Sequence, residues 1–192
     1  MARAAIGFRD HSGWAVLVAV GGEAGSPQVL LRERVELLDD PELPAQVYHA
    51  AASRDLDEAA GLIATVERSA RAAARTVVAA AVAQLKEYDV AAVALGLDRA
   101  ELPEDLAKVL RNHTSLHVGE GELYREALAD AAEACGLRAV RYDFRSLAET
   151  ATPVLGADVR DRIAAWRREI GPPWARDHKD AALAAWLALA TL

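Results

Sequence analysis

This chain of 192 residues has one cysteine, Cys135, and only three lysines. A single cysteine excludes an intramolecular disulfide and a zinc site built from cysteine thiolates. The apolar run at residues 14–20 is far shorter than the roughly 20 apolar residues that cross a bilayer. Charged residues interrupt the segment before it, so no signal peptide is predicted. These absences predict a cytoplasmic protein that does not interact with a membrane.

Positive charge is also scarce, because 22 lysines and arginines face 29 acidic residues, for a net charge of -7. Affinity for nucleic acid rests on clustered Lys and Arg that release counterions from the phosphates. The composition therefore argues against a protein that coats nucleic acid nonspecifically, but it is compatible with a local basic patch. With 53% hydrophobic and 27% charged residues, the chain is typical of a globular domain with a sizeable core.

Strand patterns occupy the first part of the chain, at residues 4–8, 14–20 and 29–37. The third of these alternates apolar and polar side chains with period two, which indicates a strand with one wet face. Turn-forming residues at 9–13 separate the first two strands. The sequence therefore predicts an antiparallel meander of three strands.

Helices and two further strands are predicted to follow. A helix over 55–87 begins where Asp55 precedes Glu58 by three residues, which is typical of a helix N-terminus. At about 1.5 Å per residue this helix is roughly 50 Å long, so we expect it to bend, to overhang the sheet or to pair with a second copy in a homodimer. Residues 90–97 are apolar on both faces, as in a central parallel strand, and residues 137–144 form a last strand. The remaining helices are predicted at 103–111, 120–135 and 158–170, with a terminal helix that begins at Asp177.

Two motifs bracket these elements: IGFRDHSGWAVLVAV near the start and WARDHKDAALAAWLALA near the end. The element order resembles that of the ribonuclease H-like superfamily. Within it, I-G-x-x-x-x-x-G-W-A resembles the first hairpin of RuvC-type Holliday junction resolvases, and H-K-D-A-A-L-A resembles their last helix. The resemblance implies one α/β domain over residues 1–192, with helical insertions near 103–111 and 158–170. Its five-stranded mixed sheet would combine a three-strand antiparallel meander with two parallel strands, flanked by helices.

The same resemblance implies an acidic metal site. In the family, carboxylates at the end of the first strand, near the end of the fourth strand and at the start of the last helix hold two divalent metals. Carried over by position, these are Asp10, Asp98 and Asp180, with His178 as an assisting group. Oxygen ligands suit Mg²⁺ or Mn²⁺, and two such ions can activate water and stabilise the leaving oxygen of a phosphodiester. The implied activity is metal-dependent cleavage of structured nucleic acid.

Arg9 departs from the family pattern, because it occupies the place of the first aspartate and Asp10 follows one residue late. A shift of one residue on a strand turns the side chain to the other face of the sheet. Two hypotheses therefore stand: a metal-dependent nuclease, or a noncatalytic interaction or scaffold protein on the same fold. Three carboxyl groups within about 5 to 6 Å of one point would support the nuclease. Carboxyl groups on opposite faces would support the noncatalytic protein.

Arg68, Arg71 and Arg75 recur at helical spacing on the long predicted helix. Such a stripe suits contacts along one phosphate backbone, and it is also an ordinary solvated helix face. It is the predicted surface for a nucleic-acid partner.

His113, His117 and Glu120 have i, i+4 and i+7 spacing, which on one helix would bring two imidazoles and a carboxylate together for a transition metal. Residues 115–119, however, have the composition of an extended or loop segment, which would separate these side chains. The sequence leaves the two interpretations open.

Overall fold

The computed structural model describes residues 1–23 and 25–192. Its five strands form one sheet in the order β3-β2-β1-β4-β5. Their bounds are β1 Ala2–His11, β2 Trp14–Glu23, β3 Ser26–Glu36, β4 Tyr88–Gly96 and β5 Arg138–Tyr142. The pairs β1–β2 and β2–β3 are antiparallel, whereas β1–β4 and β4–β5 are parallel. The predicted mixed sheet, a meander followed by two parallel strands, is confirmed.

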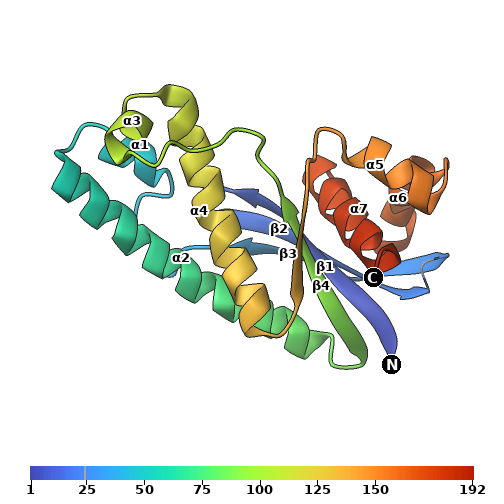
Figure 1. Cartoon of the computed structure of the whole chain (residues 1–192). Helices are drawn as coiled ribbons and strands as arrows, with labels where there is room; N and C mark the ends of the chain where they lie inside the picture. The colour runs from blue at the N-terminus through green and yellow to red at the C-terminus, as the bar shows by residue number, and fades with distance from the viewer. Residues whose placement is uncertain (24) are drawn as a thin grey trace.

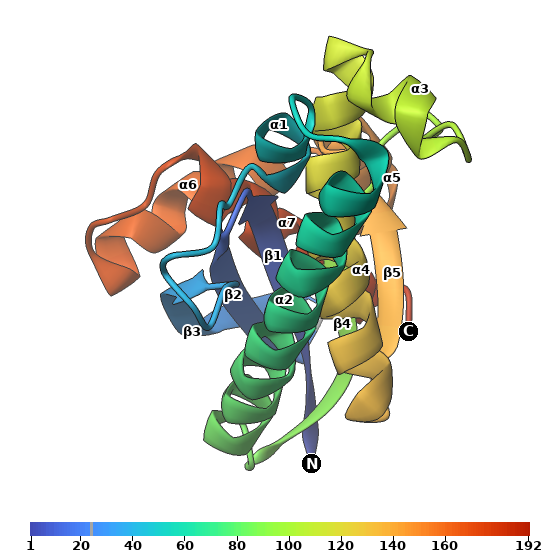
Figure 2. The ribbon, with the colours of Figure 1, turned by 90° about the vertical axis from the view of Figure 1, so that its left-hand side faces the viewer.

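Helices cover both faces of this sheet. The long helix α2 and helix α4 lie on one face, and α7 lies on the other with α5 and α6 beside it (Figures 1 and 2). The bounds are α1 Val47–Ala51, α2 Leu56–Gln84, α3 Leu106–Leu110, α4 His113–Ala134, α5 Leu147–Leu155, α6 Val159–Ile170 and α7 Arg176–Ala190. No helix in the described ranges combines the length and the apolar character needed to cross a bilayer.

Each face of the sheet has its own buried cluster, and β1 contributes to both. Ile6 and Phe8 pack with α2 and α4, while Ala5 packs with α7 and the tryptophans near it. Gly7 also lies on the α7 face, where a Cβ atom would come within 2.0 Å of the Ala181 carbonyl oxygen. The absence of a side chain at Gly7 therefore sets how closely α7 approaches the sheet.

Helix α4 is longer than the sequence predicted. The extended reading of residues 115–119 is wrong, because α4 begins at His113 and continues without a break to Ala134. Asn112 caps it: its side chain accepts a hydrogen bond from the Ser115 amide at 3.1 Å. Leu116 and Val118 are buried under this first part of the helix. Packing against neighbouring elements therefore overrides the weak local helix signal.

Other boundaries differ in detail. Helix α3 is shorter than the predicted 103–111, and α5 was not predicted, whereas α6 follows the predicted 158–170 closely. Helix α7 begins at Arg176 with Ala175 as its N-cap, and no side chain caps it. Asp177 and Asp180 therefore do not cap this helix through a side-chain hydrogen bond.

The arginine stripe on α2 is exposed, as a solvated face requires, but its members differ in their contacts. Arg71 pairs with Asp130 of α4, and Arg68 donates to the Thr65 hydroxyl of its own helix at 3.1 Å. The stripe is therefore partly engaged within the protein. Its contact with nucleic acid and the homodimer through residues 55–87 stay predictions.

Candidate functional site

Arg125, a buried residue of α4, joins two of the three predicted carboxylates. Its Nη1 donates to Oδ2 of Asp10 at 3.1 Å, and its Nη2 donates to Oδ2 of Asp98 at 2.9 Å. Its Nε donates to Glu122 one helical turn earlier, at 3.2 Å. The side chains of Arg125 and Asp10 are only 8% and 4% exposed, so this ion pair is shielded from water. A guanidinium thus occupies the space between carboxylates where a metal ion was predicted.

Glycines provide the room for this arrangement. A Cβ atom at Gly96 would lie 3.2 Å from Asp10 Oδ1 and 3.4 Å from Arg125 Cδ. At Gly121, a Cβ atom would lie 2.7 Å from Arg125 Nη2. The guanidinium therefore lies over the backbone of α4 and close to the end of β4.

Arg125 is also the start of a charged network that crosses the end of the sheet. Glu122 accepts from Arg141 of β5 at 2.9 Å, and Arg141 also donates to Glu126 at 2.8 Å. Burial by itself lowers the pKa of Arg125, but the charges of Asp10, Glu122 and Asp98 outweigh it and raise that pKa. The Arg125 guanidinium is therefore charged at neutral pH.

The third predicted carboxylate lies on the other face of the sheet. The pairing of β1 with β2 is continuous from Ala4 to His11, without a bulge that would rotate Asp10. Arg9 therefore points to the α7 face, and Asp10 points to the α4 face. On the α7 face, Arg9 Nε lies 3.9 Å from Oδ2 of Asp180. The one-residue shift seen in the sequence separates Asp10 from Asp180 and pairs each with an arginine.

Asp180 is half-buried near the start of α7, and a second arginine, Arg176, lies 3.5 Å from its Oδ2. Burial raises the pKa of Asp180, and the positive charges of Arg176 and Arg9 only partly counter this effect. A carboxyl whose pKa is raised by folding takes up a proton more readily in the folded state. Its ionised form therefore destabilises the folded state.

We expect Asp180→Asn to be slightly more stable than the wild type at pH 7. The difference should shrink as the pH falls through the raised pKa of Asp180 and vanish below the ordinary carboxyl value of 3.8. Urea midpoints of both proteins between pH 3 and pH 8 provide the measurement. A variant that is less stable at pH 7 would mean that the two arginines stabilise the ionised carboxylate more than burial costs.

His178 lies apart from the predicted acidic set. It lines a hollow of about 350 Å³ with Trp14 and Arg32, whereas Asp180 lines a different one. Burial and the nearby charge of Arg32 lower the pKa of His178, against the opposing effect of Asp177. Asp177 is itself bonded to His11 Nε2 at 3.0 Å. Within residues 1–23 and 25–192, no hydrogen bond or ion pair joins His178 to Asp10, Asp98 or Asp180, and its assisting role stays a prediction.

Two clefts lie beside the segment that follows β5, and Arg145 of that segment lines both. The larger, of about 580 Å³, has mixed charge and contains Asp98 together with Arg99, His113, His117 and Asp143. The second, of about 430 Å³, contains Asp180 and four basic residues: Arg145, Arg160, Arg176 and Lys179. Phe144, Leu147 and Ile163 form part of its apolar lining. Local basic charge thus accumulates around Asp180 although the whole chain is acidic.

Sequence reasoning missed Arg125 and His49. Arg125 could have been found from helical spacing. It lies on the same helix face as Val118, Ala129 and Ala132, which are all buried. A charged residue within an apolar stripe needs a buried partner. His49 could not have been found in this way, because it lies in a stretch without periodicity.

This chain resembles known proteins in its structure, but no family model or curated protein matches its sequence. Among solved structures, T. thermophilus RuvC in complex with a Holliday junction substrate matches with a TM-score of 0.54 and 16% identity, over 97% of this chain and 93% of that one. A second Thermus thermophilus RuvC structure matches with a TM-score of 0.51 and 17% identity, with the same coverage. The predicted resemblance is confirmed at the level of architecture: this chain has the ribonuclease H-like fold that RuvC has.

Proposed function

We propose that this chain is a noncatalytic binding protein on a ribonuclease H-like fold, and that it binds the phosphate backbone of structured nucleic acid. One observation carries the first part: Arg125 holds Asp10 and Asp98 on the α4 face, while Asp180 pairs with Arg9 on the α7 face. Fold alone does not decide between catalysis and binding. The opposite faces of these carboxylates favour the noncatalytic hypothesis.

A two-metal site does not fit these residues. Asp10 and Asp98 already pair with the guanidinium of Arg125. A Mg²⁺ or Mn²⁺ ion could bind these two carboxylates only by displacing that guanidinium. Asp180 cannot complete the set from the other face of the sheet. We therefore assign no hydrolytic step to Asp10, Asp98, Asp180 or His178.

The basic cleft around Asp180 supports the second part of the proposal. Four cationic side chains line it against a single carboxylate, which gives it a net positive charge. Lys and Arg are the side chains that most often hold phosphate oxygens in nucleic-acid complexes. One matching RuvC structure is in complex with a Holliday junction substrate, and a branched DNA is therefore the first ligand to test.

We expect the protein to bind a four-way DNA junction through a small number of phosphate contacts, so that the binding constant falls moderately as salt rises. Each contact contributes about -0.9 to the slope of log K against log salt. Charge reversal in the cleft, by Arg160→Glu or Lys179→Glu, should weaken binding to every sequence and reduce that slope by about 1. Fluorescence anisotropy from 50 to 300 mM salt measures both quantities.

Arg75→Glu on the α2 stripe is the matched control, since it makes the same charge change on an exposed helix face. Loss of binding in this variant but not in the cleft variants would move the interface to α2. Absence of binding to junction, duplex and single-stranded DNA alike would refute the nucleic-acid proposal. Cleavage of the junction with Mg²⁺ or Mn²⁺ by wild-type protein would restore the nuclease hypothesis.

A further inference from the structure

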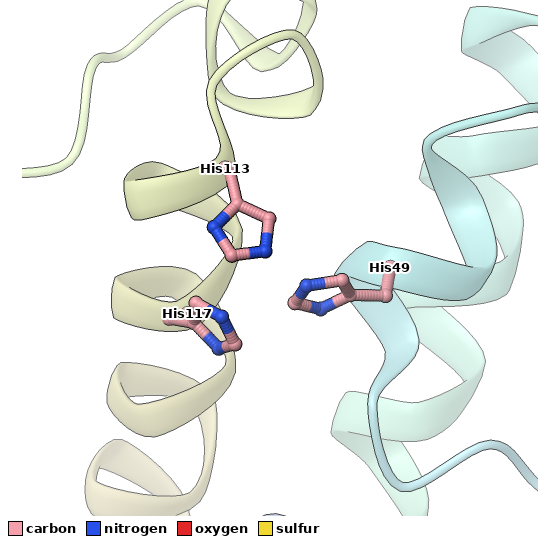
Figure 3. Close-up of side chains that lie close together, drawn as sticks. All are labelled: His49, His113 and His117. Carbon is pink, nitrogen blue, oxygen red and sulfur yellow. The ribbon is translucent and has the colours of Figure 1, made fainter.

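Three of the five histidines in the chain meet at the end of the molecule where α1 faces α4. His113 and His117 come from the first two turns of α4, and His49 comes from α1 (Figure 3). The ring of His117 lies 4.6 Å from each of the other two rings, and His49 and His113 are 5.5 Å apart, centroid to centroid. One ring nitrogen from each residue lies within 4.8 Å of the other two.

The packing of α1 on α4 fixes this arrangement. A Cβ atom at Gly119 would lie 2.9 Å from the ring of Tyr48, so glycine at this position lets α1 approach α4 closely. The hydroxyl of Tyr124 donates to the Ala45 carbonyl at 2.8 Å and secures the segment just before α1. His49 is therefore held beside α4 by contacts that do not involve the other histidines.

Glu120 follows His117 by three residues on α4, and its side chain, which contacts His49, is only 2% exposed. Its Oε1 accepts from the backbone amide of His49 at 3.2 Å and is 2.8 Å from His49 Nδ1. A carboxylate accepts hydrogen bonds, so this contact favours the tautomer of His49 with the hydrogen on Nδ1 and the lone pair on Nε2. Metal-binding histidines characteristically donate their other ring nitrogen to a carboxylate in this way.

Burial of Glu120 provides a second reason to expect a cation here. A buried carboxylate is costly unless a positive charge or hydrogen bonds compensate it. His49 contacts Glu120 directly, and His117 Nδ1 lies 3.9 Å from its Oε2. A bound divalent metal ion would supply permanent positive charge beside this carboxylate.

We infer that His49, His113 and His117 bind a divalent transition metal, with zinc as the best fit, and that Glu120 orients His49. Two histidines at i and i+4 on one helix already form a chelating pair. Tetrahedral zinc with Zn–N bonds of about 2.1 Å requires ligand nitrogens about 3.4 Å apart. The ligand nitrogens now lie within 4.8 Å of one another, and His113 and His117 are exposed, so their rings have room to rotate toward this spacing.

The site is open on one side. His113 and His117 line the cleft of about 580 Å³ that also contains Asp98 and Arg99. Three protein ligands leave a fourth zinc position for water or another oxygen ligand, and the cleft gives such a ligand access to His113 and His117. Mg²⁺ would not replace zinc here, because it prefers oxygen ligands and keeps most of its water.

Isothermal titration of Zn²⁺ into metal-stripped protein tests this inference without reference to nucleic acid. We expect one saturable site per chain in the wild type and no comparable binding of Mg²⁺. At 100 times the dissociation constant, zinc should raise the Tm by roughly 5 to 10 °C. His117→Ala and His49→Ala should both lose the site, and His117 is exposed, so its removal leaves the fold intact.

The controls separate this site from other zinc ligands in the chain. His11→Gln removes an imidazole that bonds Asp177 of α7 instead, and Cys135→Ser removes the only thiol. Both should bind zinc like the wild type. Glu120→Gln should weaken binding by about 10- to 100-fold, the usual effect of losing a carboxylate that orients a ligand. Unchanged zinc binding in His117→Ala, or no saturable binding by folded wild type, would overturn the assignment.

Discussion

Replacement of Arg125 by methionine is expected to lower the free energy of unfolding by about 3 to 5 kcal/mol. The substitution keeps much of the side-chain volume but leaves Asp10 buried without its cation. Asp98 and Glu122 can turn to solvent, because their side chains are 36% and 31% exposed, whereas Asp10 cannot. Urea unfolding followed by tryptophan fluorescence measures the loss.

Two variants make this experiment specific to the buried charge. Arg141→Met removes an arginine that also holds two carboxylates but is more exposed, so it should cost no more than about 1 kcal/mol. Asp10→Leu combined with Arg125→Met removes both charges and should recover most of the stability, as replacement of buried ion pairs by apolar residues does elsewhere. If Arg125→Met lowers the free energy of unfolding no more than Arg141→Met does, the buried pair of Arg125 and Asp10 does not stabilise the fold as we infer.

The Arg125 variant also addresses the predicted acidic metal site. Without the guanidinium, Asp10 stays buried and Asp98 and Glu122 stay within reach of the vacated position, and oxygen ligands of this kind attract hard divalent ions. Mn²⁺ should therefore restore part of the stability of Arg125→Met and leave the wild type unchanged. Stabilisation of the wild type by Mn²⁺, lost in Asp180→Asn, would instead support the assembled site that the sequence resemblance implied.

Gly7→Ala is expected to destabilise the protein by at least about 3 kcal/mol, at the upper end of overpacking effects. The new methyl group would lie 2.0 Å from the Ala181 carbonyl oxygen and 3.1 Å from the Ala185 amide nitrogen. Both are backbone atoms, so a rotamer change cannot relieve the clash and α7 must move away from β1. Thermal and urea unfolding report the loss.

Gly61→Ala serves as the opposite control. Gly61 lies on an exposed face of α2, where a Cβ atom would meet no other atom within 4 Å. Alanine in a helix interior is better than glycine by about 0.5 to 1 kcal/mol, so this variant should gain stability. Equal effects of the two substitutions would show that the close packing of β1 on α7 does not limit stability.

Much of the architecture could be read from local patterns. Period-two alternation at 29–37 and the two-sided apolar run at 90–97 identified the third strand of the meander and a central parallel strand. The same period, applied to Arg9 and Asp10, indicated that they face opposite sides of the sheet. These predictions succeeded because the alternation of side chains along a strand is a property of its own backbone. It can be recognised without knowing which other strands or helices the strand contacts.

Helix boundaries were less readable. Residues 115–119 contain little that favours a helix. The start of α4 is supported instead by the Asn112 cap, by the packing of Leu116 in the core and by the contact of Glu120 with His49. An isolated helix gains little stability from propensity, and tertiary packing supplies most of it. The metal hypothesis for His113 and His117 could therefore not be decided before the helix was seen.

The sequence by itself determined the order of the five strands, the long helix among them and the one-residue offset between Arg9 and Asp10. Tertiary structure alone decided which partners the charged residues and the histidines contact. It placed Arg125 between Asp10 and Asp98, and it brought His49 to within reach of His113 and His117. Their separations of 115 residues between Asp10 and Arg125, and of more than 60 between His49 and His113, explain why. Pairing between such distant residues depends on how helices pack across a sheet, which no local pattern encodes.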